Sequence, residues 1–139
     1  RDRLRSRGLG DVYKRQLVLG TGGASQAVQY VLAQMEIPFD LVSRNPATGN
    51  YTYDEVSDEV IGSHRLIINA SPVGMHPNVE EAPRIPYAFV TPSHYLFDLI
   101  YNPAETLFLQ YGAQRGAHTC NGLDMLVGQA EAAWAIWNR

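Results

Sequence analysis

The sequence predicts an α/β fold with three layers, in which a doubly wound parallel sheet lies between helices on both faces. Two observations support this. Short apolar runs bounded by glycine, proline or polar turns alternate with segments of helical periodicity. A glycine-rich turn separates the first apolar run from the first helical segment. No apolar run approaches the roughly 18 residues of a membrane span, and we expect a soluble cytoplasmic domain.

The first half of the chain supplies three predicted strands. Residues 17–20 (LVLG) form an apolar run that glycine ends. A helix follows over residues 23–35, where apolar side chains recur at intervals of three and four. A proline ends that helix, and residues 39–43 (FDLVS) form the second strand. The acidic segment 53–61 is expected to be a short helix, and residues 66–69 (LIIN) the third strand.

The second half continues the alternation after a loop. Residues 71–86 carry four prolines and are expected to be irregular. The fourth strand is predicted at residues 95–100. Proline suits the first turn of a helix, so a helix is predicted over residues 103–116, with Pro103 at its start. Residues 117–120 form the fifth strand, and the last helix is predicted over residues 123–137.

Charge divides the chain at residue 16. Residues 1–16 hold six of the eleven basic residues and two acids, whereas residues 17–139 hold five basic residues and twelve acids. The basic block has no periodic pattern, so we interpret it as a leader of foreign origin before a domain of residues 17–139. Binding of nucleic acid through simple charge is the less favoured alternative.

The glycine-rich turn has the chemistry of a phosphate site. Gly20 permits the tight turn, and Gly22 lets the backbone approach a pyrophosphate without an intervening side chain. The small residues 23–25 allow close packing of helix on strand, although Ser25 occupies the position of the third glycine. The helix N-terminus then offers N–H groups and a positive dipole end. We therefore predict a Rossmann-like fold that binds a dinucleotide.

The end of the second strand indicates which dinucleotide is bound. An acid about 20 residues beyond the glycines would hold the ribose 2′-hydroxyl of NAD. This strand ends Val42-Ser43-Arg44-Asn45, without an acid, and Asp40 comes too early. Arg44 can pair with a 2′-phosphate through its planar fork of donors. The cofactor is predicted to be NADP.

Other chemistry finds little support in the sequence. The four histidines lack ligand spacing, and the single cysteine, Cys120, excludes a Cys-rich zinc site. Ser71 has no GxSxG context and no paired base, so we interpret it as a turn hydroxyl. We expect no metal site and no nucleophile.

Four segments, taken in order, resemble the cofactor-binding half of the shikimate dehydrogenase family. They are residues 17–25 (LVLGTGGAS) with 43–45 (SRN), 68–75 (INASPVGM), 98–103 (DLIYNP) and 121–130 (NGLDMLVGQA). The resemblance covers residues 17–137. It implies an NADP-dependent oxidoreductase that reduces 3-dehydroshikimate to shikimate, in chorismate and aromatic amino acid biosynthesis.

The resemblance also implies roles for individual residues. The expected cofactor-binding residues are Gly20, Thr21, Gly22, Gly23, Ala24, Ser43, Arg44, Asn69, Ser71, Pro72, Leu99 and Gly122. Tyr101 and Gln129 resemble residues that contact the substrate. The usual basic residue after the family's Asn-Arg-Thr stretch is missing from residues 46–50.

The family's catalytic lysine and aspartate belong to an N-terminal substrate domain that residues 1–16 do not resemble. We therefore expect no catalytic residue in this chain, and binding of NADP(H) without turnover. The final helix would face the substrate domain, so its exposure predicts self-association. Two alternatives remain open: an NAD-using quinate/shikimate dehydrogenase paralogue, and a stand-alone nucleotide-binding regulatory module with a basic arm.

Overall fold

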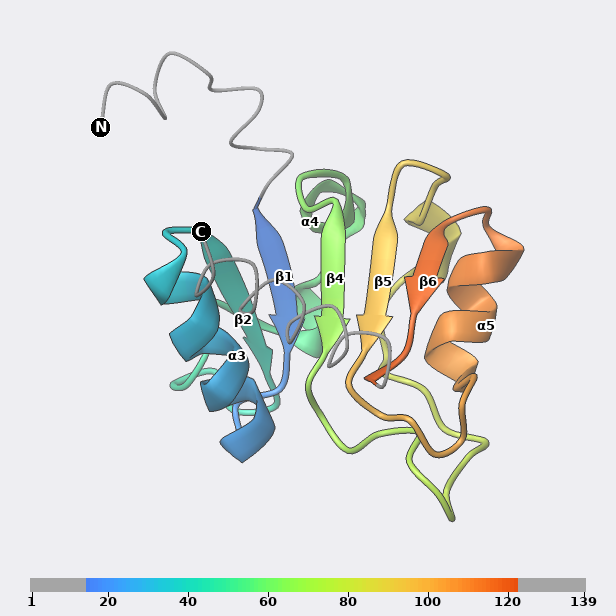
Figure 1. The fold of residues 1–139 in the computed structure, drawn as a ribbon. Coiled ribbons are helices and arrows are strands. Elements are labelled where there is room, and N and C mark those ends of the chain that lie inside the picture. Colours follow the sequence, from blue (N-terminus) through green and yellow to red (C-terminus); the bar gives the residue numbers. More distant parts are fainter. Residues whose placement is uncertain (1–14, 123–139) are drawn as a thin grey trace, which may run out of the picture.

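The computed structural model describes residues 15–122, which form a parallel sheet in the order β3-β2-β1-β4-β5-β6 (Figure 1). Starting from β1, the chain builds one side of the sheet and then crosses back to build the other. This is the doubly wound arrangement that the sequence predicts. The strands are β1 (Gln16–Leu19), β2 (Phe39–Ser43), β3 (Tyr51–Thr52), β4 (Leu66–Asn69), β5 (Tyr95–Asp98) and β6 (His118–Cys120).

Helices cover both faces because side chains alternate along each strand. Leu17 and Leu19 pack in a core with α4 (Asp58–Gly62) and α5 (Leu107–Gln114), whereas Val18 packs against α3 (Gly23–Gln34). The central strands are apolar on both faces, as expected of a buried parallel sheet. The predicted three-layer Rossmann-like class is confirmed.

The structure differs from the prediction at several elements. Residues 53–61 form a 3₁₀ turn, Tyr53–Glu55, followed by the separate helix α4, because Ser57 caps a new helix by accepting from the Val60 N–H. The two-residue strand β3, which follows β2, was not predicted; it is too short to show a period. The helix predicted from Pro103 begins at Leu107 instead.

The cause of the last difference is a cap. Thr106 accepts a hydrogen bond from the Leu109 N–H and so starts α5 four residues after the expected position. Strand β5 ends at Asp98 rather than at Ile100, because the Ile100 N–H bonds to the Asp98 carboxylate. The predicted final helix, 123–137, lies outside the described residues, as do residues 1–14 of the basic block.

The amino edge of the sheet carries a polar cluster of its own. His64 is buried, with Nε2 lying 2.7 Å from Asp40 Oδ2 and Nδ1 2.7 Å from the Val60 carbonyl oxygen. Arg15 Nε lies 3.2 Å from the same carboxylate oxygen. Gln16, placed with the leader above, is the first residue of β1. Asp40 therefore has a structural role at the edge of the sheet opposite to the carboxyl ends of the strands.

Candidate functional site

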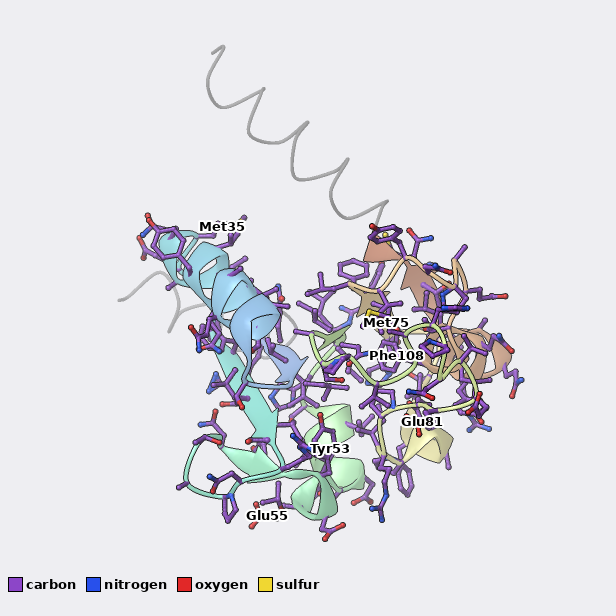
Figure 2. The ribbon with its side chains drawn as sticks, turned by 90° about the horizontal axis from the view of Figure 1, so that it is seen from below. Met35, Tyr53, Glu55, Met75, Glu81 and Phe108 are labelled. Atoms are coloured by element: carbon purple, nitrogen blue, oxygen red, sulfur yellow. The ribbon has the colours of Figure 1, made fainter. Side chains whose placement is uncertain are left out.

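One large cavity lies at the carboxyl edge of the sheet, onto which Figure 2 looks. The segments that follow β1, β2, β4 and β5 all contribute to its lining. Its volume of about 1640 Å³ exceeds the roughly 300–1,000 Å³ of ordinary ligand pockets. An open doubly wound sheet binds ligands at this edge, where the chain changes direction at β1 and β4.

The glycine turn forms one wall of this cavity. Gly20 has φ +107°, and a Cβ on it would lie 3.1 Å from the Ser71 backbone nitrogen. A Cβ on Gly22 would meet nothing within 4 Å. No side chain caps the N-terminus of α3, so its first N–H groups face the open space above Gly22. This combination of open backbone and free donors suits a pyrophosphate.

The turn after β2 is held by its own side chains. Ser43 Oγ lies 2.6 Å from Thr48 Oγ1 and accepts from the Asn45 N–H at 3.1 Å. It also lies 3.4 Å from the Thr21 hydroxyl, which links this turn to the glycine turn. Arg44 is exposed, lines the cavity and has no hydrogen bond or ion pair with the residues described. The turn therefore presents one uncommitted cation.

Asn69 organises the loop after β4 from beneath. Its Oδ1 accepts from the Ser71 hydroxyl at 2.6 Å and from the Ser71 N–H at 3.2 Å. Its Nδ2 donates to the Val73 carbonyl and to Asp98 Oδ1, each at 3.2 Å. The side chain is fully buried, so Asn69 shapes the floor of the cavity and leaves Ser71 and Pro72 to line it.

Sequence reasoning did not identify Tyr53 as part of the site. The residue lies between the turn after β2 and the loop that carries Met75 and Glu81 (Figure 2). Burial raises the pKa of its phenol, while a hydrogen bond with Ser71 and the charge of Arg44 partly offset this. Tyr53 thus lies near two of the predicted cofactor residues. A tyrosine just beyond a two-residue strand gave no pattern from which to predict this.

The predicted site residues gather at this edge of the sheet. Those that line the cavity are Gly20, Thr21, Gly22, Gly23, Ala24, Ser43, Arg44, Ser71, Pro72, Leu99 and Tyr101. Gly122 is buried instead, and a Cβ on it would collide with the Leu99 carbonyl oxygen. Gln129 lies outside the described residues. Within residues 15–122, no group of three or more His, Cys, Asp or Glu side chains could hold a metal ion, and no helix is long and apolar enough to cross a membrane.

Comparison with known proteins gives consistent matches. No family model matches the chain. A shikimate dehydrogenase (NADP(+)) of Methanococcus maripaludis is 36% identical over 140 residues, covering 91% of this chain and 50% of the relative. The enzyme of the same name from Clostridium beijerinckii is 39% identical over 132 residues, covering 87% of this chain and 47% of the relative. The chain spans about half the length of the curated relatives it matches.

Solved structures match over nearly the whole chain. Shikimate 5-dehydrogenase from Thermus thermophilus, in complex with NADP(H) and shikimate, has a TM-score of 0.70 and 28% identity, over 97% of this chain and 54% of that one. Quinate dehydrogenase from Corynebacterium glutamicum, in complex with NAD, has a TM-score of 0.66 and 22% identity, over 98% of this chain and 54% of that one. At that identity, the second match shows the fold alone.

Proposed function

Since the chain belongs to the shikimate dehydrogenase family over the half of those enzymes that it spans, we propose that it is their nucleotide-binding half and holds NADP(H). The observation that carries this proposal is the large cavity at the carboxyl edge, lined by the glycine turn, Arg44 and Ser71. Each supplies a different need of a dinucleotide: open backbone, a cation and a hydroxyl.

The residues present fit this cofactor. The open space at the Gly22 Cβ position admits a pyrophosphate, which the N–H groups of α3 would hold. Arg44 would hold a 2′-phosphate, because no acid ends β2 to take a ribose hydroxyl instead. Leu99 and Gly122, at the ends of β5 and β6, would lie at the nicotinamide end. When bound, the nicotinamide supplies the hydride that is exchanged with the substrate.

The activity of the whole enzyme follows as part of the proposal. It would interconvert 3-dehydroshikimate and shikimate. Tyr101 and Gln129 would contact the substrate, and Gln129 lies in the segment outside the described residues. Tyr101 is exposed and lines the cavity. The lysine and aspartate that move the proton would come from a substrate domain, so this chain is proposed to bind the cofactor without turnover.

A second candidate is an NAD-using quinate or shikimate dehydrogenase. The observation in its favour is Asp54, which lines the same cavity and whose negative charge would repel a 2′-phosphate. Arg44 is also the only basic residue in residues 43–52.

Isothermal titration of the chain with NADP⁺ and with NAD⁺ tests both candidates. Tighter binding of NADP⁺ supports the proposal, and tighter binding of NAD⁺ supports the alternative. Binding of neither overturns both. A shikimate oxidation assay with NADP⁺ tests the absence of turnover: product formation by the purified chain would contradict it.

A further inference from the structure

The turn after β2 provides few donors for a doubly charged phosphate. Ser43, Asn45 and Thr48 bond mainly to one another, as does Ala47, whose N–H donates to Asn45 Oδ1. Arg44 is the one basic side chain that this turn presents. A phosphate group in proteins is usually held by several charge-assisted hydrogen bonds. Further donors would have to come from another segment of the chain.

The proline-rich loop after β4 brings a second arginine to the same cavity. Arg84 lines it, and its side chain is exposed. Its two neighbours are fixed: Pro83 is buried and its carbonyl accepts from the Tyr87 hydroxyl at 2.7 Å, and Ile85 is part of the core at 6% exposure. The backbone at Arg84 is therefore anchored, and its exposed side chain borders the cavity.

Packing brings the segments that carry the two arginines to the same face of the sheet, because Tyr53 and Tyr87 both pack against the core cluster that contains Ile85. The charge of Arg44 acts on Tyr53. Burial raises the pKa of Tyr87, with smaller contributions from Tyr111, Asp98 and Tyr53. Tyr87 bonds to Pro83, the residue before Arg84. Tyr53 thus lies between the Arg44 turn and the Arg84 loop, in agreement with Figure 2.

The guanidinium of Arg84 is not committed elsewhere. Within residues 15–122 it makes no hydrogen bond or ion pair, although the acids Asp54 and Glu81 and the imidazole of His76 also line the cavity. By contrast, Arg115 donates to the Val90 and Ala88 carbonyls. A structural role of that kind is absent at Arg84.

We propose that Arg84 is a second cation for the 2′-phosphate, so that Arg44 and Arg84 hold this group from two separate loops. The inference rests on the proposed function, because it requires that the cavity take a dinucleotide. Arg84 would be a specificity-determining residue: its charge would favour the phosphorylated ribose and contribute little to the rest of the ligand. It would supply the positive charge that residues 46–50 lack.

Two small probes isolate this end of the ligand. Adenosine 2′,5′-bisphosphate carries the 2′-phosphate, and 5′-AMP does not. We expect Arg84→Gln to weaken binding of the bisphosphate by about fivefold to tenfold, the scale of one partly screened hydrogen bond to a charged group. Binding of 5′-AMP should change less than about twofold, and Arg84→Lys should retain most of the affinity for the bisphosphate.

Arg65→Gln is the matched control for net charge, because Arg65 Nε donates to the Ser93 carbonyl, away from the cavity. Calorimetry with each probe, and a thermal melt of each variant, complete the experiment. An unchanged affinity of Arg84→Gln for the bisphosphate, or equal losses for both probes, would overturn the inference. If the wild-type chain binds NADP⁺ but Arg84→Gln does not selectively weaken binding of the bisphosphate, the inference about Arg84 is overturned and the proposed function stands. If the wild-type chain binds no dinucleotide and neither probe, both are overturned.

Discussion

Asp98 accepts a 2.6 Å hydrogen bond from the Thr106 hydroxyl, so the residue that ends β5 is tied to the residue that caps α5. The same carboxylate accepts from Asn69 Nδ2, at the end of β4, and from the Ile100 N–H. One buried group therefore joins two strands and a helix beneath the cavity. Its titration and its partners give the first two predictions.

Stability should depend on pH through Asp98. Burial raises the pKa of this carboxyl above its ordinary value of 3.8, although hydrogen bonds from Thr106, Ile100 and Asn69 partly offset the increase. The folded state therefore binds the proton more tightly than the unfolded state. This contribution to stability is fully present below the unfolded pKa and is lost as the pH rises through the folded pKa.

Asp98→Asn should remove the loss of stability that ionisation of Asp98 causes. The stability of the wild type relative to Asp98→Asn is expected to fall as the pH is raised from about 4 to about 7, and urea denaturation at several pH values measures it. A difference that stays constant across this range would contradict the prediction.

Thr106→Val should destabilise the fold by about 1–3 kcal/mol. The substitution keeps the shape of the side chain but removes the donor to Asp98 and the acceptor for the Leu109 N–H. Thr106→Ser keeps the hydroxyl and is the matched control. Urea denaturation of both variants gives the comparison, and equal stabilities would show that the hydroxyl contributes little.

Two neighbouring glycines should respond differently to alanine. Gly20→Ala is expected to cost about 1–3 kcal/mol of stability, because residue 20 has φ +107° and its new Cβ would press on Ser71. Gly22→Ala should leave the melting temperature almost unchanged, since its Cβ meets nothing within 4 Å, but should weaken NADP⁺ binding by about tenfold or more.

Gly62→Ala, in α4, also meets open space and is the control for Gly22→Ala in both measurements. If Gly22→Ala bound NADP⁺ as the wild type does, the glycine turn would not be the pyrophosphate site.

Arg44→Gln should change the preference between cofactors. Loss of the guanidinium is expected to weaken NADP⁺ binding by about tenfold, because a hydrogen-bonded charge pair is removed, and to leave NAD⁺ within about twofold. Calorimetry with both dinucleotides gives the ratio of their affinities. Parallel losses for the two cofactors would mean that Arg44 does not recognise the 2′-phosphate.

His64→Phe should lower stability without changing cofactor affinity. The substitution removes both ring nitrogens and leaves the Asp40 carboxylate with only the Arg15 ion pair among the described residues. Loss of a partner for a buried charge costs about 1–3 kcal/mol or more. Urea denaturation measures this cost, and a calorimetric titration with NADP⁺ checks the affinity. A marked loss of affinity in a folded variant would show that the two edges of the sheet are coupled.

The sequence predicted the fold where patterns were strong. The apolar runs at residues 39–43 and 66–69 match β2 and β4, because buried parallel strands are nearly continuous in apolar residues. It misplaced the start of α5, because Thr106 caps the helix through a contact that also involves Asp98, whereas the preference of Pro103 for a first turn is only local. Two-residue β3 lies below the length at which alternation can be detected.

The residues of the candidate site also fall into those that a local sequence pattern predicts and those that only tertiary packing places. The glycine turn and Arg44 follow directly from a strand–turn–helix pattern, so they were predicted. Tyr53 and Arg84 reach the cavity only because a 3₁₀ turn and a proline-rich loop fold back towards the sheet. Their positions depend on tertiary packing, around Ser71 for one and around Ile85 for the other.

The two edges of this sheet have different roles, a structural role at the amino ends of the strands and the proposed ligand-binding role at the carboxyl ends. Asp40 and His64 form a buried polar pair at the amino edge, whereas the residues that line the cavity lie at or beyond the carboxyl ends of the strands. Changes in ligand preference can therefore accumulate in the loops while the sheet remains a constant frame. A laboratory selection for a new cofactor would do best to randomise residues 44–50, 53–54 and 80–84, and to leave the strands untouched.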